Sequence, residues 1–258
     1  MQIYLIKNIQ VVNEGEIKTA DVLIKNGRIE KIGSGLSTQG IEINGEGKFL
    51  LPGAIDDQVH FREPGLTHKA TIYTEAKAAV AGGVTSFMEM PNTVPPAFTL
   101  ELLEQKYEIA RNSSLANYSF YIGTSNENAD QALKVNEHKK DICGIKIFMG
   151  SSTGNLLVDN PLTLEKVFRE SEVLIATHCE NEKIIKDNLA RLKAEKKELT
   201  AADHPIIRNE EACFESSFYA IQLAKKYNMV FLHSQLLSTY RRNTGDCFVN
   251  FGTRQCTL

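Results

Sequence analysis

Short apolar runs separated by turn residues fill the first part of the chain, a pattern typical of β-strands. The run IYLIKNIQVV is followed by the polar turn NEGE and then by ADVLIKNGRIEKIG. Within the last segment, Asn26-Gly27 is a strong signal for a two-residue hairpin turn. We therefore expect residues 1–48 to form a small all-β unit, the N-terminal portion of a β-sandwich.

From residue 49 onward, short apolar segments alternate with segments of helical periodicity. The predicted strands cover residues 54–60, 86–90, 118–122, 144–148 and 174–178, and a sixth strand starts near residue 229. The predicted helices cover residues 72–81, 99–112, 127–137, 162–171, 180–197 and 210–227. Such regular alternation predicts parallel βαβ units, because parallel neighbours need a crossover connection.

Parallel βαβ units build either an open doubly wound sheet or a closed barrel. No G-x-G-x-x-G or G-x-x-x-x-G-K-[ST] motif follows any predicted strand, so the phosphate-binding open sheets lose their main support. We therefore predict an α/β fold with an incomplete TIM-type (β/α) barrel over residues 49–232. Its catalytic residues should lie at the C-terminal ends of the strands. Residues 233–258 form a tail in which strand and helix no longer alternate.

Composition narrows the classes of partner. The net charge is -3 with a pI near 6.1, which gives no reason to expect a nucleic-acid or anionic-membrane partner, since such partners favour a clustered basic face. No stretch approaches the roughly 20 apolar residues of a membrane span, so we expect a cytoplasmic protein. The five cysteines are scattered and odd in number, which suggests reduced thiols. Cys179 follows a histidine, but packing is the more usual role of a lone cysteine.

Four polar residues occupy the ends or interiors of predicted strands, where a barrel presents its site. His60 ends the first barrel strand, Asn92 follows the second, Lys146 lies in the fourth and His178 ends the fifth. A single histidine in an apolar run is usually a satisfied core residue. Imidazoles from separate strands that converge at one barrel mouth are, however, suited to binding zinc.

Lys146 is the most informative of these residues, because GIKIFMG places an ammonium group inside an apolar strand. One interpretation is structural: the amine reaches an unseen carboxylate or extends to the surface. The functional interpretation is that burial lowers its pKa, so that the neutral amine captures carbon dioxide as a carbamate. A carbamate is an anionic oxygen ligand that can bridge two metal ions.

Arg62 lies two residues after His60 in the segment HFREPG. If the strand continued, the two side chains would share a face, and the guanidinium could hold a substrate carboxylate with two hydrogen bonds. A salt bridge from Arg62 to Glu63 or Asp57 is the simpler alternative. Spacing alone does not choose between them.

Five segments occur in order between residues 47 and 228: GKFLLPGAIDDQVHFREPGLTHK, AAVAGGVTSFMEMPNT, GIKIFMGSSTG, IATHCE and HPIIRNEEAC. Together they closely resemble the class I-type dihydroorotases of the amidohydrolase superfamily. Allantoinases and dihydropyrimidinases share the superfamily layout, but the HFREPG and MPNT elements favour dihydroorotase.

The resemblance implies a hydrolase of cyclic amides that interconverts N-carbamoyl-L-aspartate and dihydroorotate in pyrimidine biosynthesis. By resemblance, Arg62 and Asn92 would hold the carboxylate of this small-molecule substrate. His60 and His178 would bind zinc. Lys146 would be the carboxylated, catalytic lysine that bridges two zinc ions, if two are present. Self-association into a homo-oligomer is compatible with this assignment.

Two departures from the family pattern stand out. Most members carry His-x-His at the first barrel strand, whereas this chain has Gln58 two residues before its histidine, and an amide oxygen is a weaker zinc donor than imidazole. The second departure is the tail. His233 is out of register with the next expected ligand, and Asp246 is no substitute for the aspartate that the family places on its last strand. A shifted reading frame over the last residues would explain the tail, and sequencing the coding region tests this.

Two alternatives stay open beside dihydroorotase. Another cyclic-amide hydrolase, such as an allantoinase or dihydropyrimidinase, belongs to the same class of enzyme. A non-catalytic scaffold subunit of dihydroorotase type belongs to a different class, and Gln58 and the absent base favour it. Metal analysis separates the classes, because a scaffold has no need for stoichiometric zinc.

The first prediction concerns solubility. A parallel barrel that stops at six strands leaves edge backbone groups and a long apolar interior exposed. We expect the purified 258-residue chain to aggregate or to require a partner. Size-exclusion chromatography with light scattering measures this, and a monodisperse monomer that melts cooperatively would contradict it.

Overall fold

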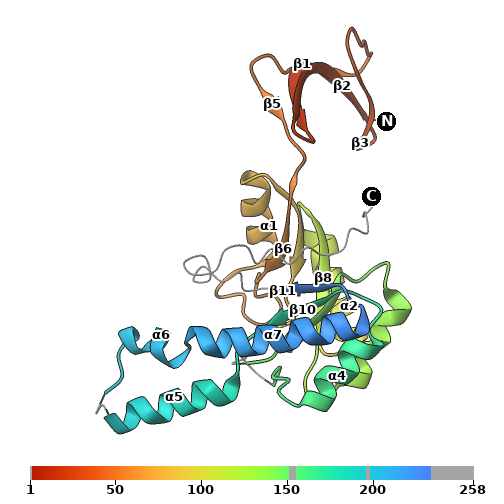
Figure 1. The fold of residues 1–258 in the computed structure, drawn as a ribbon. Coiled ribbons are helices and arrows are strands. Elements are labelled where there is room, and N and C mark those ends of the chain that lie inside the picture. The colour runs from red at the N-terminus through yellow and green to blue at the C-terminus, as the bar shows by residue number, and fades with distance from the viewer. Residues whose placement is uncertain (1, 151–154, 196–197, 234–258) are drawn as a thin grey trace. The chain divides into compact units, whose positions relative to one another are not determined.

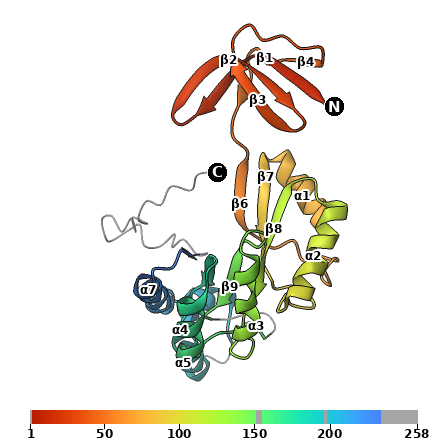
Figure 2. The same ribbon diagram turned by 90° about the vertical axis from the view of Figure 1, so that its right-hand side faces the viewer.

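A computed structural model of the chain describes residues 2–150, 155–195 and 198–233, and these form two compact units. The first unit extends to Ile55 and includes Gly83–Thr85, and the second contains the remaining described residues. Figures 1 and 2 show the first unit as strands alone and the second as a sheet with helices. The predicted change from all-β to alternating structure is therefore observed.

The first unit is one sheet built around its first strand. Its strands are β1 (Ile3–Asn13), β2 (Glu16–Lys25), β3 (Arg28–Gly33), β4 (Ile41–Asn44) and β5 (Phe49–Leu50). Strand β1 pairs antiparallel with β2 and parallel with β4 and β5. The predicted hairpin is present, since Lys25 pairs with Arg28 across Asn26 and Gly27, which both have positive φ. Among the described residues this unit supplies a single sheet.

A buried carboxylate holds the irregular part of β1. The register of β1 against β2 shifts between Ile6 and Ile9, and Asn8 has a φ of 54°. Asp21 accepts hydrogen bonds from the Lys7 amine at 2.7 Å and from the backbone N–H groups of Asn8 and Leu36, both at 3.0 Å. The carboxylate thus satisfies the backbone N–H of Asn8 at the irregularity and also binds the segment after β3 through Leu36.

The second unit is a six-stranded sheet in which spatial order follows chain order. Its strands are β6 (Ala54–Val59), β7 (Val84–Glu89), β8 (Asn117–Gly123), β9 (Gly144–Phe148), β10 (Ile175–His178) and β11 (Phe231–His233). The pairs from β7 to β11 are parallel. Doubly wound sheets reverse their strand order at a switch point, and this sheet does not. It is part of a barrel wall, as predicted.

Helices connect the strands. They are α1 (Ile72–Ala81), α2 (Leu100–Ser113), α3 (Ala129–Leu133), α4 (Pro161–Glu170), α5 (Glu182–Glu195), α6 (His204–Ile207) and α7 (Glu210–Tyr227), with 3₁₀ turns at Lys134–His138 and Ala201–Asp203. Side-chain caps from Thr71, Thr99, Asn160 and Asn209 begin four of them. None of the helices in the described ranges has the length and apolarity needed to cross a bilayer.

One predicted helix differs from its observed form. The segment 127–137 was expected to be one helix, but α3 begins at Ala129 and changes to a 3₁₀ turn at Lys134. The side-chain oxygen of Asn128 accepts hydrogen bonds from the backbone N–H and the hydroxyl of Ser125. These bonds hold the preceding residues as a turn and delay the helix.

The two faces of the sheet have different environments. Ile145, Ile147 and Ile175 belong to the main apolar core, together with Leu164 and Phe168 of α4. The opposite face carries a separate small cluster of Met90, Tyr121 and Ala176. This second face, turned away from the helices, is the inner face of the curled sheet and the one that carries Lys146.

The second prediction concerns acid stability of the first unit. Hydrogen bonds from Lys7 and the backbone lower the pKa of Asp21 to about 2. Because the folded pKa lies below the ordinary value, the ionised carboxylate contributes stability above about pH 4 that is lost as pH falls towards 2. We expect Asp21→Asn to lower the melting temperature at pH 7 and to flatten the fall in stability between pH 4 and 2.

Circular-dichroism melts at several pH values measure this effect. Glu16→Gln is the matched control, because Glu16 forms an exposed pair with Lys18 at the start of β2. Equal pH profiles for wild type and Asp21→Asn would contradict the role assigned to Asp21.

Candidate functional site

The centre of the candidate site is the amine of Lys146 on β9. Lys146 pairs with Gly123 of β8 and Ala176 of β10, so two small residues leave room for its long side chain. The residue is 1% exposed, and its Nζ lies 5.1 Å from the centroid of the Phe148 ring. The interpretation in which Lys146 extends to the surface is therefore excluded.

Burial changes the acid–base chemistry of this amine. Desolvation lowers the pKa of Lys146 to about 8, although the nearby Cys179 thiol acts in the opposite direction. A minor fraction of the amine is therefore neutral near physiological pH, which is far more than for an ordinary lysine. A neutral amine is a nucleophile, and it is the form that reacts with carbon dioxide.

His178 ends β10 and pairs with Phe148, two residues beyond Lys146 on the neighbouring strand. Residues two apart on a strand share a face, so His178 and Lys146 lie on the inner face of the sheet. The Nε2 atom of His178 is 2.7 Å from Oε2 of Glu180. The sequence prediction that these two residues share one strand-end region is therefore consistent with the geometry.

His60 follows β6, and its Nδ1 is 2.8 Å from the side-chain oxygen of Asn92. Because that oxygen can only accept, Nδ1 carries the proton and the lone pair is on Nε2. Burial and the charge of Arg62 lower the pKa of His60 to about 4, and the Lys146 ammonium adds to the effect. His60 is therefore a neutral imidazole that lies within electrostatic reach of Lys146.

The contact between His60 and Asn92 depends on two packed loops. Val94 donates a backbone hydrogen bond to Pro64 at 3.2 Å, which joins the loop after β6 to the loop after β7. Gly65 has a φ of 81°, and a Cβ there would collide with Val94. Only glycine tolerates both the positive φ and the close approach of Val94, which explains the glycine of the HFREPG motif.

Arg62 is half-buried in the first of these loops and has a φ of 67°. Glu63 instead accepts a hydrogen bond from Ile72 at the start of α1, at 2.8 Å. Among the ion pairs of the described residues, none joins Arg62 to Glu63 or Asp57. The simpler alternative of a salt bridge therefore has no support, and the Arg62 guanidinium lies close enough to His60 to lower its pKa.

The remaining candidate ligands are less favourable. Cys179 is buried, its Sγ is 3.0 Å from the Thr177 hydroxyl, and burial raises its pKa to about 11, which supports a packing role. The backbone of His233 pairs with Thr177 and not with His178. Gln58 lies in β6, two residues before His60. Asp246, Cys247 and Cys256 lie outside the described residues.

Sequence reasoning missed two buried charged pairs. Glu180 binds Arg208 through Nε at 2.7 Å and through a second guanidinium nitrogen. Lys106 and Glu89 are each 1% exposed and form an ion pair on the face of the sheet that packs against the helices. For Lys106 a signal existed, since it shares a helix face with the apolar Leu103 and Ala110. Glu180 and Arg208 lie in IATHCE and HPIIRNEEAC, two of the segments that carry the resemblance, but nothing in their spacing indicated that they pair.

The imidazoles of His60 and His178 would need a further donor to hold a metal ion. Within the ranges that the structure describes, no three His, Cys, Asp or Glu side chains cluster around one point. Two imidazoles alone do not complete a zinc site, which needs at least three protein donors. The residues fit a metal if Lys146 supplies a carbamate as a further donor beside His60 and His178.

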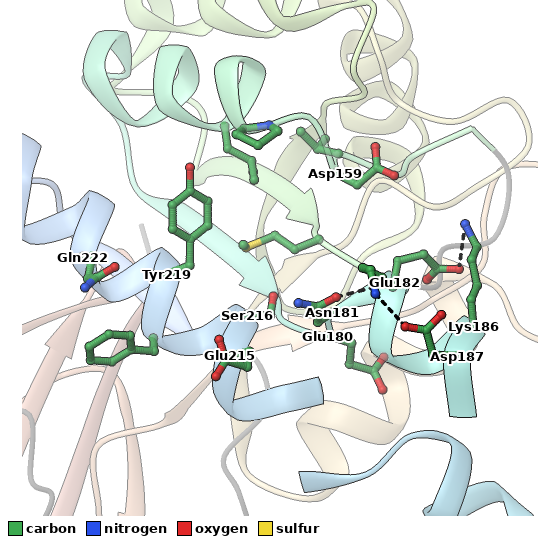
Figure 3. Close-up of a pocket in the computed structure, with 16 residues that line it drawn as sticks. Asp159, Glu180, Asn181, Glu182, Lys186, Asp187, Glu215, Ser216, Tyr219 and Gln222 are labelled. Carbon is green, nitrogen blue, oxygen red and sulfur yellow. Dashed lines mark hydrogen bonds and ion pairs between the residues drawn. The ribbon is translucent and has the colours of Figure 1, made fainter. Parts of the chain in front are cut away.

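A pocket of about 780 Å³ lies between α4, α5 and α7 (Figure 3). Glu180 and Asn181 contribute to its lining, whereas His60, Lys146 and His178 do not. The pocket is therefore separate from these three strand-end residues. Its walls mix cationic and anionic side chains, including Lys183 and Lys186 with Asp159 and Asp187.

Comparisons with known proteins bear on the same residues. The sequence profile of a family described as Dihydro-orotase-like matches residues 47–148. The chain is 37% identical over 184 residues to a dihydroorotase of Methanosarcina acetivorans, covering 69% of this chain and 39% of that protein. It is 34% identical over 185 residues to a dihydroorotase of Listeria welshimeri, covering 70% and 43%. The chain thus spans about two fifths of the length of these relatives.

Solved structures share the fold. The L-hydantoinase (dihydropyrimidinase) from Arthrobacter aurescens superimposes with a TM-score of 0.83 at 25% identity, covering 90% of this chain and 52% of that one. A dihydropyrimidinase from Brevibacillus agri gives a TM-score of 0.77 at 26% identity, covering 90% and 51%.

The third prediction contrasts the two buried lysines. A pKa lowered to about 8 means that protonated Lys146 costs the fold about 3 kcal/mol at pH 7, a cost that shrinks as pH rises towards 10. Lys146→Met should therefore raise the free energy of unfolding at pH 7, by roughly 1–3 kcal/mol. The gain should be smaller at pH 9.5.

Lys106→Met is the matched control, since it leaves Glu89 buried without its cation. We expect it to lower the free energy of unfolding by roughly 3–5 kcal/mol. Urea denaturation at both pH values measures the two variants. A loss of stability in Lys146→Met as large as that in Lys106→Met would show that the Lys146 amine is fully compensated.

Proposed function

We propose a function from the premise that the chain belongs to the dihydroorotase-like family of amidohydrolases. The proposed activity of the complete protein is reversible, zinc-dependent hydrolysis of dihydroorotate to N-carbamoyl-L-aspartate, a step of pyrimidine biosynthesis. The observation that supports it most strongly is the burial of the Lys146 amine, with its lowered pKa, on a sheet face shared with His178.

Lys146 has the first role in this proposal. Its neutral Nζ forms a bond to the carbon of carbon dioxide and releases a proton, which yields an anionic carbamate. His60 and His178 contribute imidazole nitrogens beside it, and His60 is neutral because its pKa is lowered to about 4. When bound, zinc would polarise the amide carbonyl and lower the pKa of water.

Arg62 and Asn92 have the second role, which is to select the substrate. The side-chain oxygen of Asn92 accepts a hydrogen bond from His60. Its side-chain NH₂ group takes no part in that contact and is the donor proposed for the substrate. The Arg62 guanidinium has no carboxylate partner among the ion pairs described and supplies a planar pair of donors. Together they would hold the carboxylate of dihydroorotate and place its ring amide beside Lys146.

A second candidate activity is hydrolysis of hydantoin or dihydropyrimidine rings, because solved structures that share the fold bear those names. Such rings need no carboxylate. The two activities therefore differ in their dependence on Arg62.

The fourth prediction is an assay of metal and activity together. We expect the purified chain to retain zinc in bicarbonate buffer, and a version extended to the length of its relatives to hydrolyse dihydroorotate faster than hydantoin. Elemental analysis and loss of dihydroorotate absorbance measure these outcomes. Absence of stoichiometric zinc in both forms would contradict the metal-dependent assignment, and zinc with no turnover in the extended form would favour a scaffold.

Substrate selection is tested by Arg62→Ala in the extended form. Losing a charged hydrogen-bonding partner of the carboxylate should lower kcat/KM for dihydroorotate by roughly 10- to 100-fold and leave hydantoin turnover largely unchanged. Arg111→Ala serves as the control, because Arg111 pairs with Glu104 and Glu108 on the exposed face of α2. Equal losses with both substrates would rule out a carboxylate-specific role for Arg62.

A further inference from the structure

Glu180 lies between β10 and α5 and joins two groups that sequence spacing does not connect. Its Oε2 atom is 2.7 Å from Nε2 of His178, and its Oε1 atom accepts from Nε of Arg208 at 2.7 Å. A second guanidinium nitrogen of Arg208 also binds Oε2. Glu180 is 6% exposed, so its carboxylate is largely withdrawn from water.

The backbone around this chain of contacts is held at several points. Asn181 caps the start of α5 by accepting from the N–H groups of Lys183 and Ile184. The Asn181 N–H donates to the carbonyl of Ala212 in α7 at 2.8 Å. Arg208 lies at the end of α6, where its N–H donates to His204 at 2.9 Å. Neither end of the Glu180–Arg208 pair can therefore shift without disturbing helix termini.

The charge state of Glu180 fixes the direction of its hydrogen bonds. The Arg208 guanidinium binds both carboxylate oxygens of Glu180, and this pairing favours the ionised carboxylate. An ionised carboxylate has no proton to donate, so it only accepts. The proton in the contact with His178 therefore resides on Nε2.

We propose that Glu180, held by Arg208, is a positioning residue that fixes the Nε2–H tautomer of His178 and makes Nδ1 the ring atom offered to the metal. The inference rests on the proposed function in assigning a metal ligand to His178. Carboxylates commonly orient metal-binding histidines in this way. Here the carboxylate is itself clamped by a guanidinium, which fixes the plane of the carboxylate as well as its position.

His60 provides an internal contrast. Its Nδ1 is held by Asn92, so the same reasoning assigns it the opposite tautomer, with the lone pair on Nε2. The two histidines would then present different ring nitrogens to one region. One NMR spectrum of the metal-free chain can identify both tautomers.

The test uses the 258-residue chain labelled with ¹⁵N-histidine and freed of metal with a chelator. Two-bond ¹H–¹⁵N correlations show which ring nitrogen carries the proton, and His60→Asn and His178→Asn identify the two signals among six histidines. We expect Nδ1–H for His60 and Nε2–H for His178. The Nδ1–H form at His178 would overturn the proposal without any variant.

Three variants give a second, independent reading. Glu180→Gln should mix the tautomers of His178, leave His60 unchanged and weaken zinc binding in bicarbonate buffer by roughly 10- to 100-fold. Arg208→Lys should cause a smaller change in both readings, because one contact to Glu180 survives. Glu165→Gln, which removes a carboxylate bound to Lys226 and Tyr227, should change neither.

The outcomes separate this inference from the proposed function. A His178 tautomer that depends on Glu180 in a chain that binds no zinc would uphold the positioning role and overturn the metal site. An unchanged tautomer and unchanged zinc affinity in Glu180→Gln would overturn the positioning role and leave the metal site standing. If Glu180→Gln fails to fold, the wild-type tautomer and Arg208→Lys still decide.

Discussion

Desolvation of the Lys146 amine is the constraint on which the rest of the candidate site depends. A parallel strand covered on both faces offers no water to an ammonium group, and β9 is buried along its whole length. The sheet accommodates the side chain between Gly123 and Ala176. The result is an amine with a pKa near 8, available as a nucleophile. A site that sacrifices stability for reactivity is what functional positions commonly show.

The same fold buries a second lysine, Lys106, but compensates its charge with a carboxylate. Lys106 of α2 is paired with Glu89, and its Nζ also donates to the carbonyl of Met90 at 2.9 Å. That pair lies on the helix side of the sheet, where it joins α2 to β7. Its role is structural. Lysine burial by itself is therefore ambiguous. The distinction comes from the face of the sheet and from the neighbours that the face provides.

Orientation of the imidazoles is the second level of organisation. Each of His60 and His178 has one ring nitrogen engaged by an oxygen acceptor: Asn92, from the loop after β7, contacts His60, and Glu180, just after β10, contacts His178. The scaffold that holds these contacts is shared with hydantoinases at about one quarter sequence identity. Shared architecture with different loop residues is how one barrel fold supports different chemistries. In this chain the loop after β6 carries Arg62, and Gln58 departs from the usual ligand pattern.

Local sequence determined the elements, and tertiary structure determined the environment of the charges. Helices 72–81 and 210–227 and strand 144–148 were predicted to the residue, because periodicity and capping residues act over a few positions. The burial of Lys146 was also predictable, since its flanking residues are apolar on both sides. The Glu180–Arg208 pair was not predictable, because its members are 28 residues apart and each resembles a solvated surface charge. Only the folded chain brings them together, since long-range contacts depend on how whole elements pack and leave no periodic signal in the sequence.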